Sequence, residues 1–412
     1  MRILSGSAAR REIERSAGGS LRSIAKELAV RRIVSEVRRR GDSALRKYAK
    51  RWDRLGTCPL RVSPSEIKHA AKSFRGELRA AVELSEARIR DFAIRQSPVG
   101  WMHSQDGVTF GQMVRPLDSV GCYVPGGRFP LLSTLLMTVI PAQVAGVPRI
   151  CVVSPDPRPE LLAVAHRLGV TEFYRVGGAQ AVAALAYGTK SIRRVDKIVG
   201  PGNVYVTLAK KLVAFDCSID MLAGPTEAVV VSHAGNPEWI ASDLVSQAEH
   251  DPDTRSIFIT CSQSLAKCVL ACCLRQAGNN VIACQSLRRN GCVLLAKTRS
   301  EAMDWANRIA PEHITLSRQD VERVRCAGSV FVGEHSPQAA GDYVTGPNHV
   351  LPTGGNARFR GGLTVADFVK IITVQQLSRN GLRRLAPAIV ALAEAEGLAA
   401  HAHSVRLRCG HA

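Results

Sequence analysis

The chain has 412 residues, 46% hydrophobic and 22% charged, which is ordinary for a globular protein and long enough for two or three domains. It contains no run of about 18 apolar residues, so a membrane-spanning helix is not expected. Residues 1–19 lack the apolar core of a signal peptide, which favours a cytoplasmic protein without a membrane partner.

A formal net charge of +20 is also typical of proteins that bind nucleic acids. Here, however, the basic residues are dispersed among acidic and apolar residues, and aromatic residues make up only 5% of the chain. A nucleic-acid-binding module more often concentrates its charge in one arm or alternates it with aromatic residues. We therefore expect no nucleic-acid partner, although a positive field would attract an anionic dinucleotide.

The twelve cysteines are scattered through apolar segments of a long chain, which favours reduced, buried thiols over disulfides. Cys268 and Cys272 are spaced like the start of a metal site, but no second Cys/His pair accompanies them. A thiolate metal site is not expected.

Helical periodicity dominates the first quarter of the chain. Residues 1–19 predict a short polar helix, and residues 20–95 predict several amphipathic helices without clustered catalytic residue types. Asp42 is a suitable N-cap and Gly41 a suitable C-cap within this region. These helices are interpreted as scaffold.

From Gly107 the pattern changes to strands and turns, and strand and helix signals then alternate as far as residue 334. Alternation of this kind predicts parallel sheets covered by helices on both faces. The C-terminal part begins with a Gly-rich loop and ends in helices, and no internal repeat stands out. Two α/β modules are therefore expected.

Three glycine turns follow predicted strands, at residues 123–127 (YVPGG), 176–180 (VGGAQ) and 199–203 (VGPGN). Each allows the backbone to approach a phosphate or ribose closely, and each precedes a helix N-terminus, which favours anions. None matches the Gly-x-Gly-x-x-Gly fingerprint of dinucleotide-binding proteins. By themselves they are equally well explained as tight turns.

Residues 219–250 contain an Ala-Gly-Pro-Thr-Glu turn, an apolar run typical of a strand, and a helix that begins with Pro237 and ends in Gln-Ala-Glu-His. Gln247 and His250 are three residues apart and would share a helix face, as two metal ligands do. On spacing alone, His250 is also well explained as a solvated histidine at a helix end. Further along, Glu312 and His313 are adjacent proton acceptors of different pKa before a strand.

The order of these motifs resembles the signature of the histidinol dehydrogenase family, in which an Ile-Asp-x-x-Ala-Gly-Pro-Ser/Thr-Glu turn leads to Ser-Gln-x-Glu-His. The resemblance covers nearly the whole chain. It implies NAD- and zinc-dependent oxidation of L-histidinol through L-histidinal to L-histidine, the last two steps of histidine biosynthesis, without a covalent cysteine intermediate. It also implies a homodimer in which the C-terminal segment completes the partner's site.

The resemblance implies a role for each matching residue. His313 is expected to take the alcohol proton, and Glu312 to activate water for the second oxidation. NAD is expected to contact Tyr123, Gln180 and Asn203. The expected ligands of one zinc ion per subunit are Gln247, His250, Asp342 and His401, with His403 as a rival on spacing alone. Substrate contacts are expected from Ser133, Thr226, Gln247, His250, His313, Asp342, His349, Glu396 and His401.

The fold implied is α/β, with two incomplete Rossmann-like parallel-sheet modules. The first module, which carries the metal and base residues, is expected from residues 20–122 and 228–363. The second, which binds NAD, is expected from residues 123–227. A short helical segment at 1–19 and a small helical segment at 364–412 complete the chain, and the latter is the candidate for exchange between subunits.

Two alternatives stay open. Relatives of this family could oxidise another small amino alcohol or diol, although Glu396 and His349 would then lack the amine and imidazole that they are expected to hold. The alternative from another class is a basic nucleic-acid-binding protein with a vestigial enzyme site.

Overall fold

The computed structural model describes residues 1–17, 24–126 and 131–410, which form two compact units. Unit 1 comprises residues 1–96 and 118–368, and unit 2 comprises residues 97–117 and 369–412. Unit 2 is thus built from two segments that lie far apart in the sequence. The expected boundary at residues 19 and 20 falls outside the described residues.

Sheet A of unit 1 has six parallel strands in the order β1-β11-β10-β9-β12-β13. In chain order these strands are β1 (Arg2–Ser5), β9 (Glu227–Val231), β10 (Arg255–Thr260), β11 (Cys292–Leu295), β12 (His313–Leu316) and β13 (Ser329–Val332). The helices between these strands are α1 (Gly6–Ala17), α10 (Pro237–Ala248), α11 (Gln263–Ala277), α12 (Val281–Arg289), α13 (Arg299–Ile309) and η1 (Arg318–Arg323), and α14 (Gln338–Gly341) follows the last strand.

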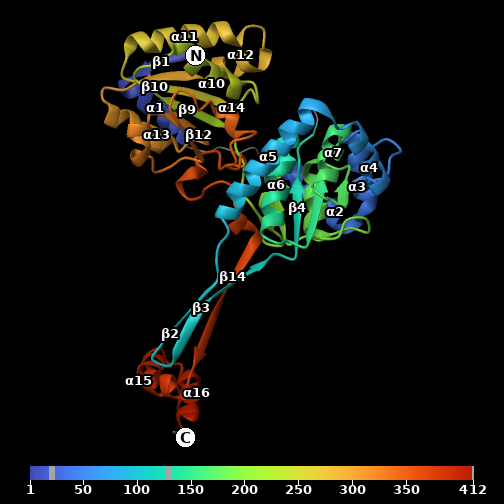
Figure 1. Cartoon of the computed structure of the whole chain (residues 1–412), viewed down its shortest axis with the longest axis vertical. Coiled ribbons are helices and arrows are strands. Elements are labelled where there is room, and N and C mark those ends of the chain that lie inside the picture. The colour runs from blue at the N-terminus through green and yellow to red at the C-terminus, as the bar shows by residue number, and fades with distance from the viewer. Residues whose placement is uncertain (18–23, 127–130, 411–412) are drawn as a thin grey trace. The chain divides into compact units, whose positions relative to one another are not determined.

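Helices cover both faces of sheet A (Figure 1), and alternate residues of its strands pack against different helices. Val229 and Val231 face α1 and α13, whereas Val230 faces α10, α11 and α12. Because both faces are covered, the whole of β9 is buried, and its sequence is a continuous apolar run after Glu227. The predicted parallel sheets with helices on both faces are confirmed.

Sheet B of unit 1 has five parallel strands in the order β6-β5-β4-β7-β8. They are β4 (Ser119–Tyr123), β5 (Arg149–Val153), β6 (Glu172–Tyr174), β7 (Lys197–Val199) and β8 (Ser218–Ile219). The helices are α2 (Ile24–Arg40), α3 (Asp42–Trp52), α4 (Pro64–Ser73), α5 (Gly76–Arg95), α6 (Leu132–Val144), α7 (Pro159–Arg167), α8 (Gly178–Tyr187) and α9 (Val204–Val213). If the strands are numbered in chain order from β4 in sheet B and from β9 in sheet A, both sheets have the strand order 3-2-1-4-5. Dinucleotide-binding folds have this order too.

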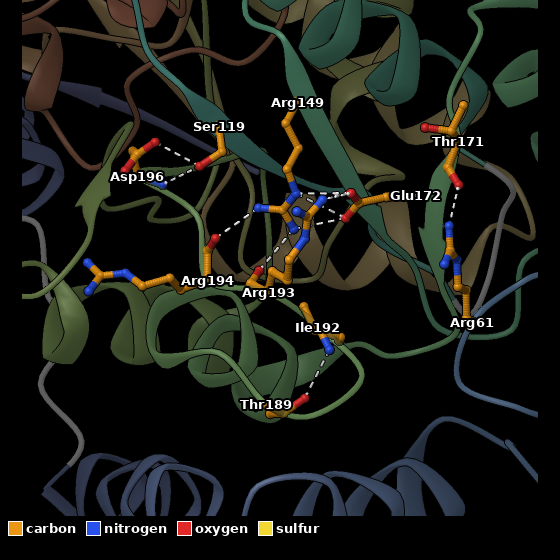
Figure 2. A network of polar contacts seen from close by, with 10 residues as sticks. All are labelled: Arg61, Ser119, Arg149, Thr171, Glu172, Thr189, Ile192, Arg193, Arg194 and Asp196. Atoms are coloured by element: carbon orange, nitrogen blue, oxygen red, sulfur yellow. Dashed lines mark hydrogen bonds and ion pairs between the residues drawn. The ribbon is translucent and has the colours of Figure 1, made fainter.

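A polar network joins the strands of sheet B at their amino ends (Figure 2). The Arg149 guanidinium donates to the Glu172 carboxylate at 2.8 Å and to the carbonyl oxygen of Arg194 at 2.8 Å. The Ser119 hydroxyl donates to Asp196 at 2.7 Å. These bonds tie β4, β5, β6 and the segment before β7 together at the amino edge of the sheet.

Residues 20–122 were expected to belong to the first module, but the helices α2 to α5 in this range pack around sheet B. Val30, Ile33 and Val34 of α2 join the hydrophobic core of sheet B together with α8 and α9. On the other side, α4 packs on α7 and α5 packs on α6. An amphipathic helix shows which of its faces is buried but not which sheet covers that face, so its periodicity could not decide between the two modules.

The N-terminus also differs from the single helix expected over residues 1–19. Residues Arg2–Ser5 form β1, a parallel edge strand that pairs with β11, and the helix α1 follows from Gly6. A four-residue strand is too short to produce a recognisable pattern in the sequence.

Unit 2 contains the antiparallel sheet β14-β3-β2 and two helices (Figure 1). These elements are β2 (Trp101–Gln105), β3 (Val108–Pro116), β14 (Val369–Leu377), α15 (Arg379–Ala395) and α16 (Ala399–Cys409). The two-residue turn Asp106-Gly107 joins β2 to β3, and both residues have positive φ, as a type I′ hairpin requires. The expected helical segment at 364–412 therefore begins instead with the short helix η3 (Val365–Phe368) and a nine-residue strand.

All twelve cysteines lie within the described ranges and are free thiols. Most are buried, as expected, but Cys58, Cys268 and Cys284 are exposed. No helix in the described part of the chain is long and apolar enough to cross a membrane.

Candidate active site and cofactor cleft

His313 begins β12 and lies at the amino edge of sheet A, where it pairs with Ala228 of β9. Its side chain is buried, and burial lowers its pKa to about 4 although the Asp342 carboxylate raises it. Nε2 of His313 lies 3.8 Å from Oδ1 of Asp342, and Nδ1 is buried without a hydrogen-bond partner in the described part of the protein. The imidazole is thus neutral at physiological pH and can accept a proton.

Glu312 and Glu227 are buried carboxyl groups at this same edge of the sheet. Burial raises the pKa of Glu312 well above its ordinary value, and the neighbouring Glu227 raises it further, whereas a hydrogen bond from Thr226 opposes the shift. Burial also raises the pKa of Glu227 to about 8. Both oxygens of Glu227 accept from the backbone N–H of Gly354, at 2.9 and 3.0 Å. Both shifts favour the neutral carboxyl form.

The loop around residues 342–349 brings His349 to this site. Nδ1 of His349 lies 2.9 Å from the carbonyl oxygen of Asp342, which can only accept, so Nδ1 carries the proton. Nε2 is then free to accept from the Thr134 hydroxyl at 3.3 Å. Thr134 lies in the first turn of α6, next to the expected substrate contact Ser133, which is partly exposed.

The end of α10 supplies Gln247 and His250. Gln247 is 1% exposed, and its Nε2 has no hydrogen-bond partner among the residues with described positions. His250 is exposed, and its backbone N–H donates to the carbonyl oxygen of Gln247 at 3.2 Å. A positive charge on His250 would lower the pKa of both His313 and His349, so these three imidazoles lie near one another.

Unit 1 therefore brings together most of the residues expected to handle the substrate: Thr226, Gln247, His250, Glu312, His313, Asp342 and His349. Three others remain: Ser133 also lies in unit 1, whereas Glu396 and His401 belong to unit 2, where both are exposed. Glu396 is the C-cap of α15, and His401 lies on α16 together with its rival His403.

Unit 1 contains three of the four expected metal ligands. In the described ranges, no three His, Cys, Asp or Glu side chains form a metal-binding group. Gln247, His250 and Asp342 nevertheless offer amide, imidazole and carboxylate donors, a combination that zinc and manganese accept. The amide of Gln247 is buried, and its nitrogen has no hydrogen-bond partner among the described residues.

Tyr123, Gln180 and Asn203 line one cleft of about 790 Å³ at the carboxyl edge of sheet B. The Tyr123 hydroxyl accepts from the backbone N–H of Gly178 at 3.0 Å, and burial raises its pKa. Asn203 caps α9, because its side chain accepts from the N–H groups of Tyr205 and Val206. Gly127, the last residue of the first glycine turn, lies outside the described residues.

Asp53 was not identified from the sequence, although it is central to this cleft. Its Oδ2 accepts from the backbone N–H of Gly177 and from Nε2 of Gln180, each at 3.0 Å. Trp52 also lines the cleft and stacks on Tyr48 with ring centroids 5.0 Å apart. Both residues end a helix interpreted as scaffold, and no motif in that segment could have singled them out.

Comparison with known proteins gives one consistent family. The family model described as "Histidinol dehydrogenase" matches residues 19–409. Histidinol dehydrogenase of Methanothermobacter thermautotrophicus is 46% identical over 390 residues, which cover 91% of this chain and 92% of the relative. That of Geobacillus kaustophilus is 44% identical over 421 residues, covering 99% and 98%. The crystal structure of histidinol dehydrogenase from Elizabethkingia anophelis superposes with a TM-score of 0.93 at 33% identity, covering 99% of this chain and 98% of that one.

Proposed function

Because the chain belongs to the histidinol dehydrogenase family, we propose that the residues at the amino edge of sheet A oxidise L-histidinol through L-histidinal to L-histidine. Membership makes the chain an oxidoreductase of the last steps of histidine biosynthesis. The observation that carries the residue-level proposal is the buried, neutral imidazole of His313 beside the Asp342 carboxylate.

We assign to His313 the role of general base. Each of the two oxidations removes one hydride, which passes to NAD+, and one proton from a hydroxyl group. A neutral imidazole can take that proton, and the nearby carboxylate of Asp342 stabilises the imidazolium that results. Burial keeps water away from this transfer.

Glu312 is proposed to act at the second oxidation, in which water adds to the aldehyde to form a hydrate. Burial raises the pKa of Glu312 well above its ordinary value, which favours the neutral carboxyl form. Glu312 can therefore donate a hydrogen bond to the aldehyde oxygen first. It acts as a base toward water only after it has lost its own proton, and a nearby cation would favour that loss.

We propose that Gln247, His250, Asp342 and His401 hold one zinc ion per subunit. When bound, such an ion fixes the imidazole and amine of the substrate. Ser133, Thr226, His349 and Glu396 are proposed as further substrate contacts, and the Glu396 carboxylate suits the ammonium group of an amino alcohol.

The cleft lined by Tyr123, Gln180 and Asn203 is proposed to hold NAD+. Its position at the carboxyl edge of a sheet with strand order 3-2-1-4-5 is where such folds bind dinucleotides. The helix α8 begins at Gly178 beside this cleft, and a helix N-terminus favours an anion such as a phosphate.

We also propose the oligomeric state, the division into domains and the cellular compartment of the protein. The chain would act as a homodimer in which residues 364–412 complete the partner's site. Its domains would follow the two sheets, with NAD+ on sheet B and the base on sheet A. Twelve free thiols are typical of a reducing compartment, which supports a cytoplasmic enzyme.

To test this function, the yield of NADH per molecule of limiting L-histidinol is measured before chelation, after chelation and after zinc is added back. Two NADH per histidinol, abolished by the chelator and restored by zinc, is the expected result. One NADH would mean that the reaction stops at the aldehyde and would remove the role of Glu312. No NADH from histidinol, with turnover of another amino alcohol, would reassign the substrate.

A further inference from the structure

We propose that unit 1 has a second ligand site, at the carboxyl edge of sheet A, which takes a nucleoside-like molecule: a flat heteroaromatic ring with hydroxyl or amino groups and no phosphate. This site is separate from both the candidate active site and the cofactor cleft. The proposal does not depend on the roles assigned to His313 or the metal ligands.

The site is a cavity of about 550 Å³, within the range of about 300–1,000 Å³ found for small-molecule pockets. It is lined by the segments that follow β9, β12 and β13, together with the first turns of α10. The connections of sheet A run outward in opposite directions from β9 and β12, so the cavity occupies the topological switch point. Ligands of open α/β sheets bind at this point.

The cavity and the candidate active site lie at opposite edges of the same sheet. His313 begins β12, whereas Leu316, which lines the cavity, ends it. Likewise, Glu227 begins β9 and Val231 ends it. At about 3.3 Å per residue, a strand of this length separates the two sites by roughly 10 Å or more. A ligand in the cavity would therefore not occupy the position of the reacting alcohol.

The cavity corresponds to the cofactor cleft of sheet B, because the two sheets share one strand order. The β9–α10 connection (residues 232–236, SHAGN) takes the place of the glycine turn after β4. Gly235 in this connection has φ of 116°, a conformation that favours glycine. No repeat is visible in the sequence, so the correspondence emerges only from the strand order.

An aromatic pair lines the cavity. The rings of Trp239 and His335 have centroids 5.5 Å apart and are tilted by 51°, and Trp239 is 45% exposed. A large aromatic surface left partly open beside a pocket is suited to stacking on a flat heteroaromatic ring.

The polar groups of the cavity select against phosphate. Its lining contains the carboxyl groups of Asp243, Asp320 and Glu334 but one arginine, Arg299. Furthermore, Pro237 has no N–H, and the N–H of Glu238 donates to the side chain of Asn236 at 2.9 Å, so the start of α10 offers little to an anion. In the cofactor cleft, by contrast, α8 has no side-chain cap.

The same groups suit hydroxyl and amino groups. Carboxylates accept from a ribose diol or an exocyclic amine, as an acidic residue does for the ribose of NAD. His233 supplies a donor: its Nδ1 accepts from the N–H of Cys261 at 3.1 Å, so its proton lies on Nε2, which has no partner among the described residues. Burial lowers the pKa of His233, which keeps this ring neutral.

The test is adenosine binding, measured calorimetrically on the full chain saturated with NADH so that the cofactor cleft is filled. We expect adenosine to bind and AMP to bind at least tenfold more weakly. Trp239→Ala and His335→Ala should each weaken adenosine binding by about tenfold or more, since stacking is worth about that factor. Trp101→Ala, which removes an equally exposed tryptophan of unit 2, is the matched control and should change nothing.

Several outcomes would overturn the proposal. Failure of adenosine to bind the NADH-saturated protein would show that there is no second site, and unchanged binding in both variants would show that the site lies elsewhere. AMP binding as tight as adenosine would overturn the assigned ligand class. Dehydrogenase activity of each variant serves as the folding control, because neither residue belongs to the proposed catalytic set. His335 is exposed, so its removal tests the site even if Trp239→Ala does not fold.

Discussion

Oδ1 of Asp342 lies 3.8 Å from Nε2 of His313, while the backbone carbonyl of the same aspartate lies 2.9 Å from Nδ1 of His349. One residue therefore places two different oxygens beside two imidazoles. The loop that carries Asp342 is fixed in turn by Asn348, whose side chain donates to the carbonyl of Met137 in α6 at 2.7 Å. Movement of this loop would disturb the base and the substrate contact together.

Replacement of His313 by glutamine should lower kcat about 100-fold to 10,000-fold, because no other neutral imidazole takes its position as base. The KM for L-histidinol should change far less, since Gln247 and Glu396 are unchanged. Initial rates of NADH formation measure both constants. His166→Gln, at an exposed histidine of α7, is the control and should leave kcat unaltered. A kcat within tenfold of the original enzyme would remove His313 from the mechanism.

Asp53→Ala should raise the KM for NAD+ about tenfold or more, because Gly177 and Gln180 lose a shared acceptor and a buried hydrogen-bond donor without a partner costs about 1–3 kcal/mol. Asp53→Asn keeps one carbonyl oxygen and should have a smaller effect. The exposed Asp156 lines the same cleft, so Asp156→Asn controls for the loss of charge. Equal effects of Asp53→Ala and Asp156→Asn would attribute the change to charge instead of positioning.

Mixing two inactive variants tests whether the C-terminal segment acts on the partner's site. If Glu396 serves the other subunit, a heterodimer of His313→Gln and Glu396→Ala contains one intact site. An equimolar mixture, after dissociation and reassembly, should then recover about a quarter of the original activity for random pairing. If both residues serve the same subunit, no activity returns. His313→Gln mixed with itself gives the background rate.

Glu172→Gln should destabilise unit 1 at neutral pH and make its stability less dependent on pH. Burial raises the pKa of Glu172, but hydrogen bonds from Arg149 and Arg193 outweigh burial and hold it below its ordinary value of 4.5 (Figure 2). A carboxylate with a lowered pKa stabilises the fold above the unfolded-state value, and this contribution disappears as pH falls through the folded-state value.

The thermal midpoint of the Glu172→Gln variant should thus lie below that of the original protein at pH 7, with a loss of about 2–3 kcal/mol for a broken, partly buried pair. The difference in thermal midpoint between the variant and the original protein should become smaller below pH 4.5. Glu160→Gln, at an exposed glutamate of α7, should show neither effect. A difference that stayed constant with pH would exclude the ion pair as its cause.

Structural elements could be predicted from the sequence where one continuous motif contains both the local structure and the chemical groups. The run from Thr226 through β9 to His250 contains its own turn, strand and helix, so these elements could be predicted from the sequence, whereas the ligand roles of Gln247 and His250 stay predictions. Assignment of α2 to a sheet, and the role of Asp53 at the end of α3, depend on which distant surface covers each helix. Periodicity does not contain that information.

Strand β14 shows a second reason why part of the fold could not be predicted from the sequence. Its residues are largely β-branched and amide-bearing, which suits a strand, but the Gly-rich loop before it and the strong helical pattern after it favoured a helical interpretation of the whole segment. Its partner β3 lies more than two hundred residues earlier, and pairing over that distance has no local signal. The shared strand order of the two sheets was invisible for the same reason.

The pairing of β3 with β14 also sets an order of events during protein synthesis. The hairpin of β2 and β3 leaves the ribosome long before residue 369 is made, and a two-stranded ladder alone is marginally stable. Until β14 arrives, nine residues of β3 present unpaired backbone groups to any other nascent strand. A chain that terminates before residue 369 would keep the edge of β3 unpaired permanently. Interrupted translation should therefore yield aggregates or substrates for chaperones and proteases.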